Sequence, residues 1–181
     1  IGGKTGTTDD AGYCFTSAYN RDGDEIYTVI LNSTTNDQRF TDTATLANWY
    51  YGHKATVAIA NTQEKTANGN PLMARISQTD WTDKTIDATL ADPAAQATVF
   101  SLAGEVTEKV SYDDLSGTVH VGDKVGSVTL KQDGTKIAVM DLVADEEGTG
   151  PNPIEWLLVK LDRLGRRIDN RPLTAESETV A

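Results

Sequence analysis

Eight short β-prone runs between residues 53 and 147 constrain the fold more than any other feature of this sequence. Each run has four to eight residues rich in Val, Ile, Leu and Thr, and successive runs begin about ten residues apart. Turn sequences such as Asn68-Gly69 and Asp133-Gly134 separate them. Many short strands at this spacing are typical of a small all-β sandwich or barrel. The expected strands span residues 55–60, 72–77, 85–90, 97–102, 106–112, 118–121, 126–131 and 136–143.

The first 52 residues have a different pattern, in which three short strands precede a helix. Strands are expected over residues 1–8, 11–19 and 25–31, and a helix over residues 39–51. Asp22-Gly23 is a strong hairpin signal between the second and third strands. Phe40, Leu46 and Tyr50 recur at helical spacing, and Gly52 ends the helix. We expect this segment to expose an apolar face.

A linker over residues 148–153 leads to a predicted amphipathic helix over residues 154–169. Its apolar side chains recur at i, i+3, i+4, i+7, i+10 and i+14, which places them on one face. They are Ile154, Leu157, Leu158, Leu161, Leu164 and Ile168. Arg171-Pro172 ends the helix, and the polar, acidic last ten residues are expected to be disordered. The chain is therefore predicted to be an α+β protein in three parts, residues 1–52, 53–147 and 148–181.

The composition excludes several classes of function. The formal charge is −11, whereas a surface that binds nucleic acid needs clustered Lys and Arg, so we expect no nucleic-acid partner. Cys14 is the one cysteine, and the two histidines, His53 and His120, lie in other segments. The pattern of a nucleophilic thiol is therefore not evident, and Cys14 is interpreted as a small buried hydrophobic residue. The sequence predicts no metal, no cofactor and, without any run of 18 apolar residues, no membrane-spanning helix.

The motif Gly3-Lys4-Thr5-Gly6 admits three interpretations. It could be the end of a P-loop, but that loop leads into a helix whose N-terminus binds phosphates, and residues 7–19 have the pattern of loop and strand. It could be a Gly- and Thr-rich edge strand with an exposed lysine. It could also be a strand that binds a peptide ending in a carboxylate. In that case Lys4 supplies a cation, Thr5 donates a hydrogen bond, and Gly6 lets the substrate backbone approach closely because it lacks a Cβ.

The residues around this motif resemble the serine-type D-alanyl-D-alanine carboxypeptidases, the low-molecular-mass penicillin-binding proteins. The matching residues are Lys4-Thr5-Gly6-x-Thr8, Ala11-Gly12-Tyr13-Cys14, Ala18, Thr28-Val29-Ile30-Leu31, Arg39-Phe40 and Leu46-x-x-Trp49. Residues 117–126, 133–134 and 142–144 are similar to the C-terminal β domain of that family. The resemblance implies the C-terminal piece of a β-lactamase/transpeptidase-like domain (three antiparallel strands and a helix), then a small all-β sandwich domain and a C-terminal amphipathic helix.

The resemblance also implies an enzyme and its substrate. The family members are hydrolases that remove the terminal D-Ala from peptidoglycan pentapeptides through an acyl-enzyme, and they bind β-lactam antibiotics. They act in cell-wall synthesis and cell shape at the outer face of the cytoplasmic membrane, in the bacterial cell envelope. The substrate-binding residues implied here are Lys4, Thr5, Gly6, Thr7 and Thr8, with Arg39 in support.

The catalytic motifs of the family are missing from this chain. The acylated serine belongs to a Ser-x-x-Lys motif, and a Ser-x-Asn motif assists proton transfer; neither occurs in these 181 residues. The chain starts with Ile1-Gly2-Gly3-Lys4, without an initiator Met and directly in a motif. We therefore expect a C-terminal fragment, with the nucleophile and its base upstream, that is inactive alone and does not bind penicillin covalently.

The helix over residues 154–169 resembles the membrane-surface anchor of the same family. Five basic residues stand against three acidic ones between positions 154 and 171, on a chain whose charge is −11. Its leucines could insert at the headgroup boundary while its cations meet anionic lipid. The predicted anchor residues are Trp156, Leu157, Lys160, Leu161, Arg163, Leu164 and Arg167. The alternative is a helix that packs on the β domain or on a second copy of itself.

Two other functions remain open at this point. One is a non-catalytic module that binds the cell envelope through the β domain alone. The other is a related β-lactamase or endopeptidase. A Ser-x-x-Lys motif upstream would exclude the non-catalytic module, and the β domain and amphipathic helix favour the carboxypeptidase.

Overall fold

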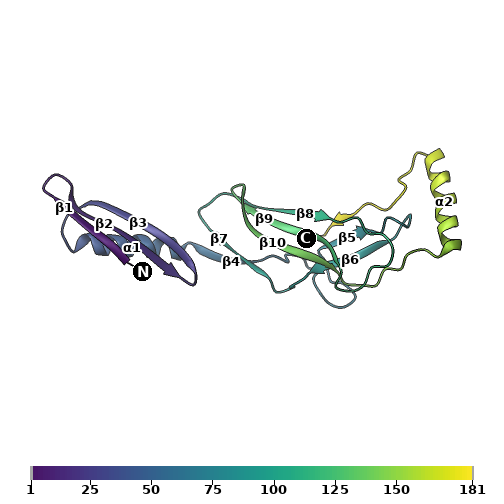
Figure 1. Cartoon of the computed structure of the whole chain (residues 1–181), viewed down its shortest axis with the longest axis horizontal. Helices are drawn as coiled ribbons and strands as arrows, with labels where there is room; N and C mark the ends of the chain where they lie inside the picture. The colour runs from purple at the N-terminus through teal and green to yellow at the C-terminus, as the bar shows by residue number, and fades with distance from the viewer. Residues whose placement is uncertain (1, 181) are drawn as a thin grey trace. The chain divides into compact units, whose positions relative to one another are not determined.

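The computed structural model describes residues 2–180, which divide into two compact units (Figure 1). The first unit comprises Ile1–Ala55 and Phe100–Leu102, and the second comprises Thr56–Val99 and Ala103–Ala181. The strands and two helices confirm the predicted mixture of α and β structure. The predicted first strand and the predicted tail include residues 1 and 181, which lie outside the described residues. Neither described helix has both the length and the hydropathy that crossing a bilayer requires.

In the first unit, three antiparallel strands and one helix follow one another in the predicted order. They are β1 (Gly2–Thr8), β2 (Gly12–Arg21), β3 (Asp24–Ser33) and α1 (Gln38–Gly52). β2 lies between β1 and β3. The turn between β2 and β3 has positive φ at Asp22 (54°) and Gly23 (86°), as a two-residue hairpin loop of Asp-Gly requires. The predicted hairpin is therefore confirmed.

The two faces of this sheet differ in burial. On one face, the ring of Phe15 in β2 meets the ring of Phe40 in α1 edge to face, with 5.0 Å between centroids, and Thr28 of β3 is buried. Successive side chains of a strand point to opposite faces, so the neighbours of Thr28 lie on the other face. The exposed large side chains there are Tyr27, Val29 and Leu31. This apolar face agrees with the sequence prediction.

The second unit is built on a six-stranded antiparallel sheet. Its strands, in spatial order, are β11 (Glu178–Thr179), β5 (Ala74–Ser77), β6 (Thr85–Leu90), β10 (Thr135–Ala144), β9 (Lys124–Gln132) and β8 (Val106–Tyr112). β4 (Lys54–Ala58) and β7 (Gln96–Phe100) form a separate two-stranded sheet. Alternate side chains of the large sheet supply the core, in which Ile76, Leu90, Val125 and Leu142 are fully buried. β5, β6, β9 and β10 coincide with four of the predicted runs rich in Val, Ile, Leu and Thr.

The predicted strand over residues 118–121 is wrong. This segment makes a single bridge, in which Val119 exchanges two backbone hydrogen bonds with Gly148. Gly117 and Gly122 have φ of 71° and 89°, and the backbone N–H of His120 donates to the Asp123 carboxylate at 2.8 Å. Turns at both ends therefore leave too short an extended segment for a strand.

The prediction of a disordered tail is also wrong for its last described residues. β11 pairs with β5, with Glu178 opposite Arg75, and these two side chains form an ion pair at 2.9 Å. The backbone N–H of Val180 donates to the carbonyl of Met73 at 2.9 Å. β5 offers a free edge that a polar segment can cover by main-chain hydrogen bonds, which composition alone does not reveal.

Candidate functional site

The predicted substrate-binding residues from Lys4 to Thr8 all lie on β1, at one edge of the three-stranded sheet. β1 pairs with β2 from Gly2, opposite Ala18, to Thr8, opposite Gly12. Its other edge has no strand partner in the described part of the chain. Side chains along β1 are exposed except that of Thr5, which is half-buried. An extended peptide could therefore add to this edge by main-chain hydrogen bonds.

Lys4 and Thr5 project to opposite faces of the sheet, because they are neighbours on a strand. The Lys4 ammonium donates to the Thr5 carbonyl at 2.6 Å, so it lies against its own strand. A Cβ on Gly6 would meet no atom within 4 Å, which leaves open space over this residue. Both polar groups can reach one ligand only if that ligand lies along the outer edge of β1.

Arg39 of α1 is a buried cation that joins β1, β2 and α1. Its Nη1 donates to the Thr7 hydroxyl at 3.1 Å and lies near the carbonyls of Gly6 (3.5 Å) and Cys14 (3.4 Å). The side chain is 7% exposed and forms no ion pair with any described carboxylate. The structure thus brings the predicted supporting residue to the end of the predicted substrate strand. Carbonyl and hydroxyl dipoles stabilise its charge, together with the rings of Phe40 and Tyr13, whose centroids lie 5.0 Å and 5.7 Å from the guanidinium carbon.

Two polar residues near Arg39 were not identified from the sequence. Asn36 accepts a hydrogen bond from Nη2 of Arg39 at 2.5 Å. Asp42 accepts from the Gln38 amide at 2.6 Å and the Ser33 hydroxyl at 2.7 Å, and these bonds hold the pKa of the Asp42 carboxyl below its ordinary value. α1 starts at Gln38, one residue before the predicted helix, and this start gives Gln38 and Asp42 the i,i+4 spacing at which helical side chains meet. Asn36 precedes the helix, so helical spacing does not indicate its contact with Arg39.

Cys14 and the two histidines make local contacts rather than a reactive group. The Cys14 thiol donates to the Ala11 carbonyl at 3.3 Å, and this residue is half-buried, not buried as predicted. Nδ1 of His53 lies 2.6 Å from the Trp49 carbonyl. Among the described residues, no cluster of three His, Cys, Asp or Glu side chains could hold a metal ion.

The second candidate surface is α2 (Pro153–Ile168), which matches the predicted helix within one residue at each end. A capping box stabilises the N-terminus of this helix. The Asn152 side chain accepts from the backbone N–H groups of Ile154 and Glu155, and the Glu155 carboxylate accepts from the Asn152 N–H at 2.8 Å. The helix is therefore stabilised locally, independently of any apolar partner.

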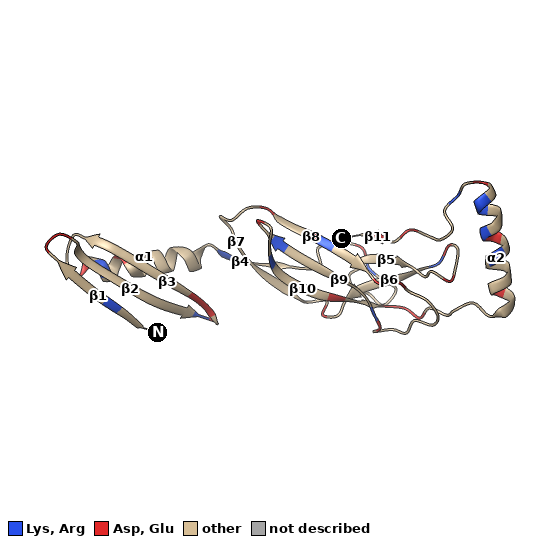
Figure 2. Ribbon diagram, turned by 45° about the horizontal axis from the view of Figure 1, so that its top comes forward, with Lys and Arg blue, Asp and Glu red and all other residues tan. Residues whose placement is uncertain are grey.

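α2 contacts the second unit through charged side chains. Nη2 of Arg163 donates to the carbonyls of Thr79 (2.6 Å) and Trp81 (2.9 Å), and Arg166 forms an ion pair with Asp83 at 2.5 Å. Val159 is the one described residue of α2 that is buried. Figure 2 shows Lys and Arg along this helix with acidic residues between them. The helix does lie on the domain, but by its polar side.

The apolar face of α2 is left exposed. Leu157, Leu161 and Leu164 are each more than half exposed, as are the other members of the stripe. Those members are Ile154, Leu158 and Ile168, with Trp156 beside them. Six large apolar side chains on one face of one helix form an exposed patch that soluble monomers rarely tolerate.

No protein-family model matches the chain. Two solved structures align with most of it. The D-alanyl-D-alanine carboxypeptidase DacD from Francisella tularensis is 20% identical with a TM-score of 0.41, and the alignment covers 82% of this chain and 36% of that one. Penicillin binding protein 5 from Haemophilus influenzae is 18% identical with a TM-score of 0.41, and the alignment covers 80% of this chain and 41% of that one. The chain therefore spans about two fifths of the length of these proteins or less. Its structural neighbours are a D-alanyl-D-alanine carboxypeptidase and a penicillin-binding protein, the group that its sequence motifs resemble.

Proposed function

We propose that this chain is the C-terminal part of a serine-type D-alanyl-D-alanine carboxypeptidase and that β1 is its substrate strand. The observation that supports this most is the position of Lys4-Thr5-Gly6 on an edge strand with no outer partner in the described chain. A P-loop needs a helix directly after its lysine, and here a second strand, β2, follows instead. The P-loop interpretation therefore does not fit this geometry.

Each residue of the strand has a distinct role in this proposal. The stem peptide adds to the outer edge of β1 in an extended conformation, and its terminal carboxylate comes to rest beside Lys4 and Thr5. The ammonium supplies a fixed positive charge and the hydroxyl donates a hydrogen bond. Gly6 leaves room for the peptide backbone. Arg39, bonded to Thr7, fixes the far end of the strand and adds positive potential beneath it.

The acyl transfer itself requires groups that this chain does not contain. In the proposed enzyme, a serine of a Ser-x-x-Lys motif attacks the carbonyl of the penultimate D-Ala, the terminal D-Ala leaves as an amine, and water then hydrolyses the ester. The described strand binds and orients the substrate and does not move protons. Activity therefore depends on joining β1 to the residues that hold the serine.

The chain alone is expected to remain unmodified by penicillin. Its serines lack the neighbouring lysine that activates the hydroxyl, so incubation with a fluorescent penicillin should leave the intact mass unchanged. Intact-mass spectrometry checks this, with a penicillin-binding protein of known activity as the positive control. A stoichiometric adduct on any serine of this chain would refute the proposal, as would an upstream coding sequence without Ser-x-x-Lys.

We also propose that α2 anchors the protein to a membrane surface, and thus places it at the outer face of the cytoplasmic membrane. Support comes from the six apolar side chains that α2 leaves exposed while its charged side binds the second unit. A helix with this pattern lies in the plane of the interface, with its apolar face among the acyl chains. A helix packed on the β domain by its leucines does not agree with this arrangement.

A further inference from the structure

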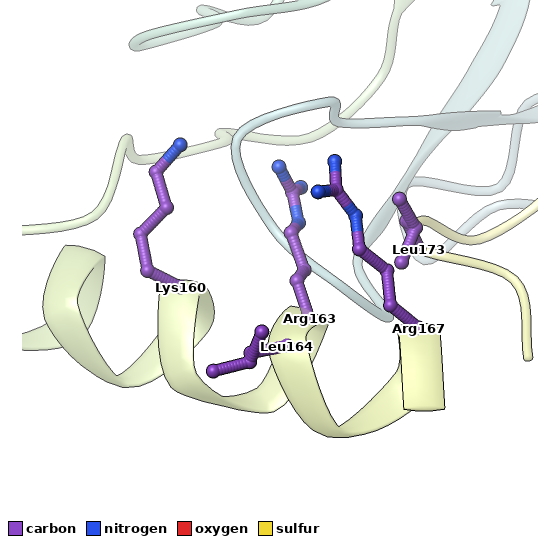
Figure 3. Close-up of a pocket in the computed structure, with 5 residues that line it drawn as sticks. All are labelled: Lys160, Arg163, Leu164, Arg167 and Leu173. Carbon is purple, nitrogen blue, oxygen red and sulfur yellow. The ribbon is translucent and has the colours of Figure 1, made fainter. Parts of the chain in front are cut away.

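A pocket of about 250 Å³ lies beside α2, and its walls are basic on one side and apolar on the other (Figure 3). Its lining residues are Lys160, Arg163, Leu164, Arg167 and Leu173. Figure 3 shows the side chains of Lys160, Arg163 and Arg167 extending from the same side of the helix. Because a water molecule takes ~30 Å³, the pocket has room for a phosphate group with part of an attached glycerol.

The three cations of this pocket lack carboxylate partners, unlike their neighbours. Arg166 is paired with Asp83 and Asp162, and Arg171 with Asp169. Lys160, Arg163 and Arg167 form no ion pair with any described residue. Nε of Arg163 is also buried without a hydrogen-bond partner in the described chain. An anion in the pocket would relieve both the repulsion among the cations and part of this unmet hydrogen bonding.

The pocket lies on one flank of the exposed apolar face. Successive residues of an α-helix are about 100° apart, so Lys160 and Asp162 lie on either side of Leu161. The flank with Asp162 is neutralised by Arg166, at 2.8 Å. The flank with Lys160 also carries Arg167, two helical turns further along α2. No acidic residue lines the pocket on this flank. One edge of the apolar face is therefore strongly basic and the other is not.

We propose that this pocket binds the phosphodiester headgroup of an anionic lipid. The inference rests on the proposed membrane anchor, because the lipid reaches the pocket only when the apolar face is in the bilayer. The occupant is a lipid rather than a free anion, since Leu164 and Leu173 form an apolar wall that suits a glycerol and its acyl esters. The chain has a charge of −11, so an anionic membrane repels it as a whole. A localised basic site explains how the same membrane can attract this part of the protein.

The test compares vesicle binding by the whole chain and by charge variants. Titration with phosphatidylcholine vesicles measures the apolar anchor, and titration with vesicles that also contain phosphatidylglycerol adds the headgroup charge. The double variant K160Q/R167Q is expected to lose about 25-fold in affinity for the anionic vesicles, about fivefold per charge, and to keep its affinity for phosphatidylcholine. Both side chains are exposed, so the fold should persist, which circular dichroism checks.

The matched control is R171Q, which removes one charge close to α2 but outside the pocket. It should change the affinity for anionic vesicles less than twofold, because Arg171 is already paired with Asp169. If R171Q loses about fivefold, the loss expected for each charge of K160Q/R167Q, diffuse attraction to the anionic surface would replace the pocket as the explanation. A K160Q/R167Q variant that binds anionic vesicles like the wild type would also overturn it.

Two further outcomes separate the causes of failure. If the wild-type chain binds phosphatidylcholine but shows no preference for anionic vesicles, the pocket proposal fails and the anchor stands. If it binds neither kind of vesicle, the anchor fails and the lipid pocket fails with it.

Inorganic phosphate added without vesicles should give no saturable shift of the arginine Nε–H resonances below about 10 mM. A saturable shift below that phosphate concentration would show that the pocket binds free anions, and it would overturn the proposal that the pocket binds a lipid headgroup.

Discussion

Replacing Leu157, Leu158 and Leu161 together with Gln is expected to weaken binding to phosphatidylcholine vesicles about a thousandfold. These side chains are 54%, 59% and 57% exposed, and each is expected to bury its apolar surface in the bilayer. Losing about 1.4 kcal/mol per leucine corresponds to about tenfold each. None of the three fills the core, so the domain should remain folded. Co-sedimentation with vesicles measures the effect.

The control for this variant uses apolar residues of similar exposure from three separate segments of the sequence. L102Q/V121Q/V139Q removes three side chains that are 58%, 53% and 48% exposed, and it should bind like the wild type. Equal losses in the two triple variants would contradict the anchor, because binding would then follow general surface hydrophobicity. Deleting residues 154–181 is a poorer test, since it also removes β11 from the edge of β5.

Arg39→Met is expected to destabilise the first unit by about 3 kcal/mol. Met preserves much of the volume of the side chain but leaves the Thr7 hydroxyl and the Asn36 carbonyl without their donor. The loss concerns a 7% exposed group, so water does not readily replace the guanidinium. Hydrogen exchange of the amides of β1 and β2 should accelerate about a hundredfold.

Arg21→Met provides the matched control for Arg39→Met. Arg21 is exposed, donates to the Asn48 side chain at 3.1 Å and lies 4.4 Å from the centroid of the Tyr51 ring. Such surface contacts contribute about 1 kcal/mol or less, so exchange should accelerate no more than about fivefold. If Arg39→Met changes exchange as little as Arg21→Met does, then the buried guanidinium does not hold β1 in place.

Local patterns were sufficient to predict most of the secondary structure. Asp22-Gly23 adopts the positive φ that its hairpin turn requires, and the β-prone runs over residues 85–90 and 136–143 coincide with β6 and β10. The two errors have different causes. Turns at Gly117 and Gly122 shorten the segment over residues 118–121, whereas Glu178 pairs with Arg75, a distant partner that is not evident from the neighbouring sequence.

For the candidate sites too, the local sequence predicts some features and only the structure reveals the others. Helical spacing predicts the apolar stripe of α2, but only the contacts of Arg163 and Arg166 reveal that the charged side meets the domain. Likewise, Lys4 and Thr5 were predicted as one carboxylate site, whereas strand alternation sends them to opposite faces of β1. The site therefore has to be at the edge of the strand, a restriction that the motif alone does not contain.

The position of Lys4 on the edge of β1 can be tested by activity in the protein that joins this chain to its upstream residues. The measurement is the kcat/KM for release of D-Ala from a peptide that ends in D-Ala-D-Ala, for the wild type, Lys4→Ala and Lys54→Ala. Lys54 is a matched lysine, paired with Asp24 at 3.0 Å and away from β1 in the sequence. We predict a loss of at least about 100-fold for Lys4→Ala and less than threefold for Lys54→Ala, because only Lys4 meets the carboxylate. D-Ala release that is unchanged by Lys4→Ala, or absent from the wild type, would contradict the account.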